Sequence, residues 1–304
     1  PFLFLHVLTV VLTVQKLEDI RKNLVKIFQT KIEKTPAFKH ATEVPIYFNN
    51  SEERIMEYDF NKIIFEAESP YQNIKILDSP TLGKCLLLDD LQNLGECDLS
   101  YTHALMKYQE NSYKDKEILI LGGGDGGLLY ELLKEDPKFV TLIDISFYNL
   151  FIMTIEVIEA CRKHMRSVCG SSMDTFTSHQ HEIIVDDCFK KMDVFIQEGR
   201  KFDHIFNDLT DIPIHKEKDK GADDTWALIK KILNTCLPML KPGGSYLNHA
   251  IGITCKDSLA KYEELLSNLP VKVTYSQHSA YVPSFIETWT FYEVRKVEES
   301  NETQ

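Results

Sequence analysis

The sequence predicts an α/β protein in which a doubly wound parallel sheet follows a small antiparallel β unit. From about residue 115 onward, apolar runs alternate with amphipathic segments, the pattern of a parallel sheet covered by helices. A glycine-rich segment, Leu121-Gly-Gly-Gly-Asp-Gly-Gly127, joins the first apolar run to the first amphipathic segment. Between about residues 54 and 92, strand-like runs are separated by turn sequences such as Ser79-Pro80, which favours antiparallel pairing.

The expected elements follow from these patterns in chain order. A helix stop at Lys241-Pro-Gly-Gly244 separates the longest expected helix from a late strand. In the small unit, strands are expected at 63–65, 73–77 and 85–88. In the α/β part, strands are expected at 117–121, 139–145, 182–185, 203–208, 244–248, 271–275 and 288–294, and helices at 128–134, 156–167, 188–198, 226–240 and 257–268.

Composition and charge narrow the functional classes. The chain has 304 residues, of which 43% are hydrophobic and 26% charged, as in ordinary globular proteins. A net charge of −12 disfavours nucleic acid and membranes as partners and permits cationic ligands. The seven cysteines form no C-x-x-C pair, so we expect no disulfide framework and no metal site. This cysteine usage favours a reducing, cytoplasmic location.

The N-terminal part differs from the rest. Residues 1–14 are apolar, but they lack the basic start and cleavage site of a signal peptide and are short for a bilayer span. We expect them to be a remnant of a larger protein or a mis-assigned exon, followed by an amphipathic helix over 16–34 and a linker over 35–50. The predicted domains are a remnant and linker at 1–50, a small antiparallel β domain at 51–112, an α/β domain at 113–296 and a disordered tail at 297–304.

The glycine-rich segment is the most specific local feature. Gly122, Gly124 and Gly127 fit G-x-G-x-x-G, in which glycines let the backbone turn tightly and approach a bound nucleotide. Asp125 is unusual at the centre of such a loop, because a carboxylate would repel a pyrophosphate. An acid here suits a ligand with a positive centre. We therefore favour a sulfonium nucleoside or an amine over a dinucleotide.

Acidic residues follow four of the expected strands. Asp125 follows the first strand, Asp144 ends the second, Asp187 follows the third and Asp208 ends the fourth. Ligands of open α/β sheets bind beyond the carboxyl ends of the strands, so these acids are expected to share one site.

Each acid has a functional interpretation and a structural alternative. Asp144 lies about 20 residues beyond the glycine loop, where an acid usually binds ribose hydroxyls, or it is a surface turn residue. Asp187 can accept a hydrogen bond from an adenine amino group while Cys188 packs on the ring, or it can cap helix 188–198. Asp208 can take a proton from an attacking amine, or it can bond within its own loop.

Two further segments carry weaker indications. Gln72 is a polar residue at the start of a strand, and Glu287 lies beside aromatic residues near the C-terminus. An acid next to aromatic faces can bind an amine through its charge and through cation–π attraction. Either feature alone is more often structural.

Together these segments strongly resemble the polyamine aminopropyltransferase family, over residues 54–295. Asn207-Asp-Leu-Thr210 and Asp224-Thr-Trp226 are similar to its spermine-forming branch, whereas the spermidine-forming branch typically has Asp-Ser-Ser/Thr-Asp-Pro there. The other matching stretches are Glu57-Tyr-Asp59, Ser69-Pro-Tyr-Gln-Asn-Ile-Lys-Ile-Leu77, Asp98-Leu-Ser-Tyr-Thr102, Ile118 to Gly127, Asp187-Cys188 and Pro283-Ser-Phe-Ile-Glu287.

The resemblance implies a fold, a reaction and a set of site residues. The fold is a seven-stranded Rossmann-like sheet of the methyltransferase type, in a protein that forms a homodimer at full length. The reaction transfers an aminopropyl group from decarboxylated S-adenosylmethionine, a co-substrate rather than a cofactor, to spermidine, giving spermine and methylthioadenosine. The implied roles are general base for Asp208, amine binding for Tyr101, Asp125, Phe285 and Glu287, and nucleoside binding for Gln72, Gly122, Gly124, Asp144, Asp187 and Cys188.

Three departures from the family pattern keep other readings open. Asp144-Ile-Ser146 replaces the usual Glu-x-Asp, and about eight extra residues within 146–154 are expected to bulge as a loop or lengthen the next helix. Phe285 stands where the spermine-forming branch usually has Tyr. The alternatives are a catalytically impaired homologue that binds polyamine or nucleoside, and spermidine formation from putrescine. A methyltransferase or an NAD-dependent dehydrogenase is disfavoured, because Asp125, Asp208 and Glu287 suit a polycation.

Overall fold

The structure is a computed structural model that describes residues 14–31, 44–51, 54–68, 72–145, 151–214 and 220–297. The chain divides into two units, Pro1–Thr42 and Glu43–Gln304. The first unit contains helix α1 (Val14–Phe28), where the sequence predicted a helix over 16–34. Most of the apolar N-terminal run, the tail from residue 298 and the segment 146–150 lie outside the described residues. Among the helices that are described, none is both long enough and apolar enough to cross a membrane.

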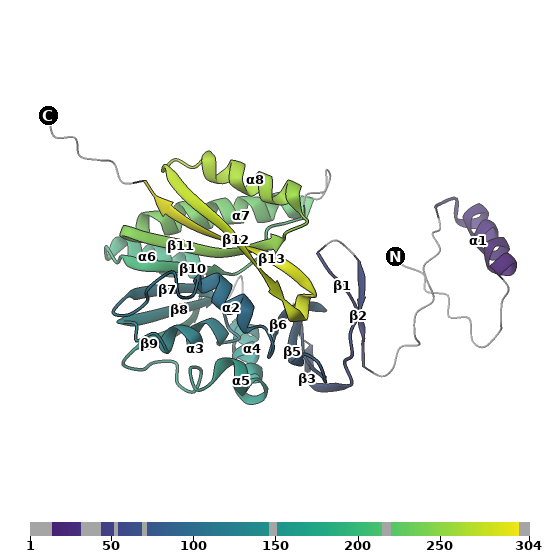
Figure 1. Ribbon diagram of the computed structural model, residues 1–304, viewed down its shortest axis with the longest axis horizontal. Coiled ribbons are helices and arrows are strands. Elements are labelled where there is room, and N and C mark those ends of the chain that lie inside the picture. Colours follow the sequence, from purple (N-terminus) through teal and green to yellow (C-terminus); the bar gives the residue numbers. More distant parts are fainter. Residues whose placement is uncertain are drawn as a thin grey trace. The chain divides into compact units, whose positions relative to one another are not determined.

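The second unit is built on a seven-stranded sheet with the order β12-β13-β11-β10-β7-β8-β9 (Figure 1). This confirms the predicted fold class. Neighbours from β11 to β9 are parallel, whereas β13 runs antiparallel to both β11 and β12. The strands are β7 (Glu117–Gly122), β8 (Phe139–Ile145), β9 (His181–Asp186), β10 (Phe202–Asp208), β11 (Leu240–Gly252), β12 (Val273–Val282) and β13 (Glu287–Lys296).

Strand β7 lies inside the sheet between β10 and β8, so the chain reverses its direction of winding at the carboxyl end of β7. Its residues Ile118, Leu119, Ile120 and Leu121 are fully buried. An apolar run of this kind is expected for a parallel strand that is covered on both faces. The glycine loop therefore begins at the topological switch point of the sheet.

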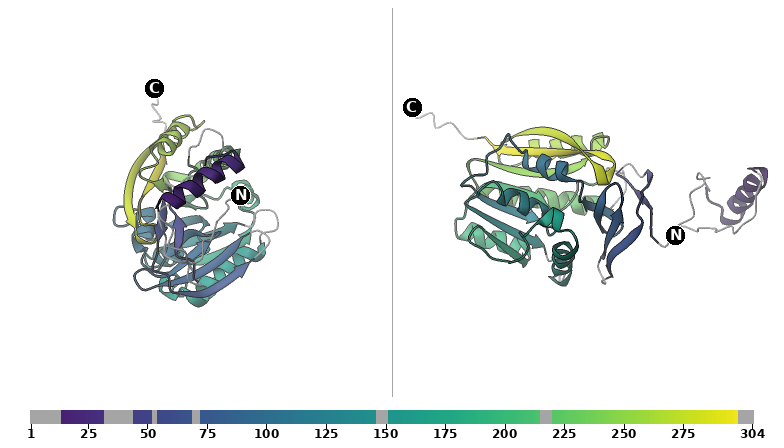
Figure 2. Two further views of the ribbon diagram at one scale, coloured as in Figure 1. Left: turned by 90° about the vertical axis from the view of Figure 1, so that its right-hand side faces the viewer. Right: turned by 60° about the horizontal axis from the view of Figure 1, so that its bottom comes forward.

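Helices cover both faces of the sheet, α3 to α5 on one and α6 to α8 on the other (Figures 1 and 2). The helix predicted at 156–167 begins earlier, so the last residues of the extra segment lie in it and lengthen it. The α/β helices are α3 (Gly127–Leu133), α4 (Phe151–His164), α5 (Arg166–Cys169), α6 (Cys188–Gln197), α7 (Lys220–Cys236) and α8 (Lys256–Ser267).

Strand β11 departs most from the prediction, because it begins at Leu240 and contains the expected helix stop. Its register against β10 shifts between the pairs Phe202–Leu240 and His204–Ser245. Gly243, with φ of 72°, lies within the bulged segment. A glycine in the left-handed region lets a strand accommodate extra residues, which explains why a turn sequence continues as strand here.

A four-stranded antiparallel sheet and a hairpin precede the large sheet. The sequence predicted β3, β4 and β5, but it missed β2 and β6, and it assigned β1 to a linker; β6 has no β-branched residue. The hairpin packs through Phe48, Tyr58 and Phe60, whose rings lie 5.0–5.7 Å apart. The strands are β1 (Tyr47–Asn49), β2 (Ile55–Glu57), β3 (Lys62–Glu68), β4 (Asn73–Ser79), β5 (Gly83–Leu88) and β6 (Leu91–Gly95).

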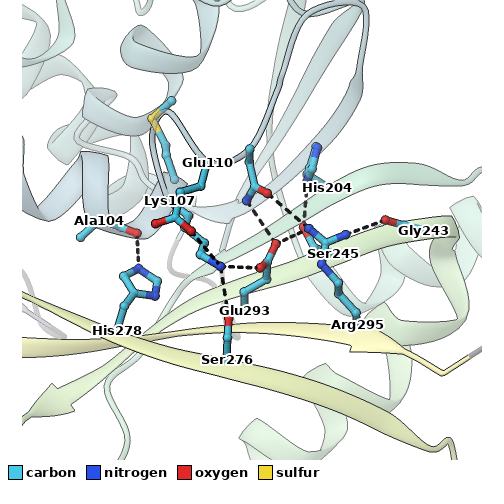
Figure 3. Close-up of polar contacts among 12 residues, drawn as sticks. Ala104, Lys107, Glu110, His204, Gly243, Ser245, Ser276, His278, Glu293 and Arg295 are labelled. Carbon is cyan, nitrogen blue, oxygen red and sulfur yellow. Dashed lines mark hydrogen bonds and ion pairs between the residues drawn. The ribbon is translucent and has the colours of Figure 1, made fainter.

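Helix α2 (Leu99–Met106) connects the small sheet to the large one and was not predicted. Polar contacts fasten its C-terminal end to strands β12 and β13 (Figure 3). Lys107 donates to Glu293 at 3.0 Å and Arg295 donates to the same carboxylate at 2.6 Å. Burial alone would raise the pKa of Glu293, but these hydrogen bonds outweigh it and lower that pKa. The network fixes the helix that carries Tyr101.

Candidate active site

A cleft of about 530 Å³ opens at the carboxyl ends of β7, β8 and β10. Residues from the small sheet, from α2 and from the segment before β13 complete its wall. Of the predicted site residues, the cleft brings together Gln72, Tyr101, Gly122, Gly124, Asp125, Asp144, Asp208 and Phe285.

The glycine loop passes very close to its neighbours. Gly122 has φ of 86°, and a Cβ there would lie 2.3 Å from the backbone oxygen of Asp208. A Cβ on Gly124 would lie 1.9 Å from Oδ2 of Asp144. The two glycines therefore give the ends of β10 and β8 the space in which their carboxylates reach the cleft.

Asp208 is held by groups from two other elements. Its side chain is only 11% exposed, and its Oδ1 accepts a hydrogen bond of 2.8 Å from the hydroxyl of Tyr101. Nε2 of His249 lies 3.5 Å from the same oxygen. Burial, followed by the charge of Asp208, raises the pKa of Tyr101 well above its usual value, so the hydroxyl keeps its proton and remains a donor.

Asp125 is a second, partly buried carboxylate of the cleft. Its Oδ1 accepts a hydrogen bond of 2.8 Å from the backbone N–H of Gly127 at the start of α3. Burial first, and then the charge of Asp208, raise the pKa of Asp125 to about 7. A cation bound between the two carboxylates would relieve this repulsion, whereas an anion would increase it.

Asp98 positions Phe285 in the wall of the cleft by binding the preceding residue, Ser284. The Asp98 carboxylate accepts from the backbone N–H groups of Gly95 at 2.6 Å and of Ser284 at 2.9 Å, and from the Ser284 hydroxyl. The Phe285 ring then lies 5.9 Å from the ring of Tyr101, edge to face. Asp98 thus joins the start of α2 to the segment before β13.

Three predicted site residues do not line the cleft. Asp187 caps helix α6, accepting from the backbone N–H groups of Phe189 and Lys190. Cys188 is fully buried against the core, and burial raises the pKa of its thiol to about 12. Glu287 accepts hydrogen bonds from the backbone N–H of Ser51 at 3.1 Å and from its hydroxyl at 2.7 Å. The ligand-binding roles predicted for these three residues stay predictions.

Comparison with known proteins places the chain in a family. Residues 98–304 match the family model of the spermine/spermidine synthase domain. The chain belongs to the spermine/spermidine synthase family. Residues 46–96 match a second model, the spermidine synthase tetramerisation domain, which covers the hairpin and the small sheet.

Relatives of this spermine/spermidine synthase family member include several polyamine aminopropyltransferases. That of Aeropyrum pernix is 25% identical over 75% of this chain and 68% of its own length. Polyamine aminopropyltransferase 1 of Aquifex aeolicus is 31% identical, but the match covers about half of each protein, 51% in both cases. A thermospermine synthase of Arabidopsis thaliana is 24% identical over 76% of this chain and 64% of its own length.

Solved structures agree with the fold. A spermidine synthase from Thermotoga maritima superposes with a TM-score of 0.63 at 20% identity, covering 82% of this chain and 78% of the other. A spermidine synthase in complex with the transition state analogue AdoDATO gives a TM-score of 0.62, also at 20% identity, with 88% and 84% coverage. At this level of identity the likeness establishes the fold alone.

Sequence reasoning missed several polar residues of the cleft, of which His249 and Asp211 lie beside Asp208. Nδ1 of His249 lies 3.0 Å from Oδ1 of Asp211. A histidine within the apolar run of β11, Tyr246 to Ile251, was the available indication. This indication was not sufficient. The sequence does not reveal the bulge in β11, so it could not show which residue of that strand lies at the carboxyl edge of the sheet.

The raised pKa of Asp125 predicts a pH-dependent stability. Its folded pKa, about 7, lies above the unfolded value, so the folded state binds more protons between about pH 4 and 7 and stability falls as pH rises through this range. Asp125→Asn should remove this pH dependence and stabilise the unliganded protein at pH 8 by on the order of 4 kcal/mol, because the pKa of Asp125 rises from near 4 to about 7 and one pKa unit corresponds to about 1.4 kcal/mol. Chemical unfolding at pH 5 and pH 8 checks this, and equal gains at both values would contradict it.

Proposed function

We propose that this chain transfers an aminopropyl group from decarboxylated S-adenosylmethionine to spermidine, giving spermine and methylthioadenosine. The observation that carries the proposal is the meeting of two partly buried carboxylates, Asp125 and Asp208, in one cleft at the switch point of the sheet. Such a site suits a sulfonium nucleoside and a polyamine and is unsuited to a pyrophosphate. Membership of the spermine/spermidine synthase family supports the same reaction class.

Aminopropyl transfer requires a base for the attacking amine and groups that position its nitrogen. The acceptor nitrogen attacks the methylene carbon bonded to sulfur, the C–N bond forms, and the C–S bond breaks with its electron pair passing to sulfur. The leaving group is a neutral thioether, so no acid is required. A protonated amine cannot attack, and we assign Asp208 as the group that takes the proton and holds the nitrogen in line. No metal or cofactor takes part in this scheme.

The remaining assignments follow the walls of the cleft. Asp144, at the end of β8 beside Gly124, is proposed to bind the ribose hydroxyls, and Gln72 the nucleoside from the small sheet. Tyr101 and Phe285 give an aromatic wall for the methylene chain of the amine. We further propose that the full-length protein is a cytoplasmic homodimer.

Product analysis tests the proposal. The protein is incubated with decarboxylated S-adenosylmethionine and either putrescine or spermidine, and the polyamine formed is separated from thermospermine by chromatography. Spermine as the main product is expected. If spermidine forms from putrescine as fast as spermine forms from spermidine, spermidine is not the preferred acceptor and the proposal is wrong on this point. Methylthioadenosine binding without any turnover would favour the catalytically impaired homologue. The altered segment Asp144-Ile-Ser146 is the observation that raises this alternative.

Glu287 provides a prediction about acceptor length. If it binds the distant amine of spermidine, its carboxylate must leave Ser51 when the acceptor enters. Glu287→Gln should then raise the KM for spermidine by about tenfold, roughly the 1.5–3 kcal/mol of one charged hydrogen bond, without changing methylthioadenosine affinity. Ser51→Ala is the matched control, because it removes the hydroxyl that donates to Glu287 at 2.7 Å but keeps the carboxylate and the backbone N–H contact. A larger loss in Ser51→Ala than in Glu287→Gln would mark the contact as structural.

A further inference from the structure

Directly behind Asp208, the buried imidazole of His249 contacts the more exposed carboxylate of Asp211. Strands β10 and β11 are parallel, with Asn207 opposite Asn248, so the next residue of each strand, Asp208 and His249, emerges at the same edge of the sheet. The His249 side chain is 7% exposed, whereas that of Asp211 is 57% exposed. The imidazole therefore bridges a buried carboxylate and one that faces solvent.

The two oxygens of Asp208 have different surroundings. Oδ1 accepts from Tyr101 at 2.8 Å and lies 3.5 Å from Nε2 of His249. Oδ2 faces the glycine loop, since a Cβ on Gly123 would lie 3.6 Å from it. Within the described part of the chain, Oδ2 receives no hydrogen bond. One oxygen is thus fixed by protein groups, and the other points to the loop that lines the cleft.

The charge of the imidazole follows from its neighbours. Burial lowers the pKa of His249, but hydrogen bonding to Asp211 and the charges of Asp211 and Asp208 outweigh burial and raise that pKa above its usual value. The titratable groups that face this site are Tyr101 on α2, Asp125 in the glycine loop, and Asp208 and Asp211 at the end of β10. Among these groups, His249 is the one that can carry a positive charge.

We propose that His249, oriented by Asp211, is a positioning residue that acts together with Tyr101 to hold Oδ1 of Asp208 and leaves Oδ2 as the atom that takes the amine proton. This inference rests on the proposed function and assigns the proton acceptor to one atom. As the C–N bond forms and the C–S bond breaks, the proton on the attacking nitrogen passes to Oδ2. A positive charge on the imidazole would hold Oδ1 by electrostatic attraction, which leaves Oδ2 to the amine.

Kinetics of His249→Gln and His249→Ala against pH test the proposal. The glutamine keeps a hydrogen-bond donor but loses the charge, whereas the alanine loses both. With decarboxylated S-adenosylmethionine and spermidine, kcat is expected to fall about tenfold in the glutamine variant and further in the alanine variant, while the KM for the nucleoside stays unchanged. The acidic limb of the kcat profile should move up by about one pH unit in both, as expected for removal of an opposite charge.

A matched control and a second readout keep the outcome clear. His204→Gln also removes a buried histidine from the sheet, at the opposite end of β10 from Asp208, but burial lowers the pKa of His204 to about 4, so no cation is lost and the acidic limb should stay in place. NMR titration should show that the pKa of His249 falls in Asp211→Asn and in Asp208→Asn. The proposal is overturned if neither kcat nor the acidic limb of its pH profile changes in His249→Gln. It is also overturned if the pKa of His249 is at or below the ordinary value for histidine. If the unaltered protein turns over neither acceptor, the proposed function fails, and the assignment of Oδ2 fails with it, even where the titration shows the ion pair.

Discussion

Asp208→Asn is expected to lower kcat by about 10²–10⁴-fold, the range typical of a lost general base. The asparagine side chain has the same shape, and its oxygen can still accept the hydrogen bond that Asp208 receives from Tyr101 at 2.8 Å. What disappears is the acceptor for the amine proton. Methylthioadenosine affinity should therefore change little, because the nucleoside is assigned to Asp144 and Gln72 on other elements.

Asp203→Asn is the matched control for this variant. Asp203 lies at the opposite end of the same strand, where it pairs with Lys241 at 2.8 Å. The substitution removes one charge from β10 without touching the cleft, so the stability of the protein is expected to fall while kcat stays near its original value. A kcat for Asp208→Asn within a few-fold of the unaltered protein would exclude Asp208 as the base.

The same substitution has a consequence at Asp125. Burial and the charge of Asp208 together raise the pKa of Asp125 to about 7. Without the Asp208 charge, the part due to repulsion is lost, and the pKa of Asp125 should move down toward its usual range. Carboxyl chemical shifts followed by NMR across pH 4 to 8 would detect this movement independently of turnover.

The sequence predicted the catalytic edge of the sheet because its determinants are local. Four consecutive buried residues followed by glycines specify β7 and its loop, and Asp208 directly ends an apolar run. The small sheet was partly missed for the opposite reason. Strand β6 and helix α2 depend on contacts that are distant in sequence, such as the Asp98 bonds to Ser284 and the Lys107 bond to Glu293.

The site shows the same division between local and distant determinants. Asp144 is a residue of β8, whereas Asp187 directly follows β9, and helix α6 takes the Asp187 carboxylate as its cap. Both uses of Asp187 were visible in the sequence, and only the helix geometry separates them. Glu287 is engaged by Ser51, 236 residues away, a contact that no local pattern contains.

The close approach of Gly122 to β10 predicts a large loss of stability when Gly122 is substituted. Gly122→Ala should destabilise the protein by about 2–5 kcal/mol, because two costs add. A non-glycine residue at φ of 86° costs about 1–2 kcal/mol. The new Cβ would also lie 2.3 Å from the Asp208 backbone oxygen, and such overpacking typically costs about 1–3 kcal/mol more.

Gly243→Ala separates these two costs. Gly243 has a similar φ of 72°, but a Cβ there would meet nothing within 4 Å, so only the backbone strain of about 1–2 kcal/mol is expected. Thermal unfolding of both variants measures the difference, at roughly 2–4 °C per kcal/mol. Because the clash at Gly122 pushes directly on Asp208, Gly122→Ala should also lower kcat, by about 10²-fold for a displacement near 1 Å, whereas Gly243→Ala should not. Equal losses of stability and activity in the two variants would show that β10 moves aside freely and that the loop does not fix the position of the base.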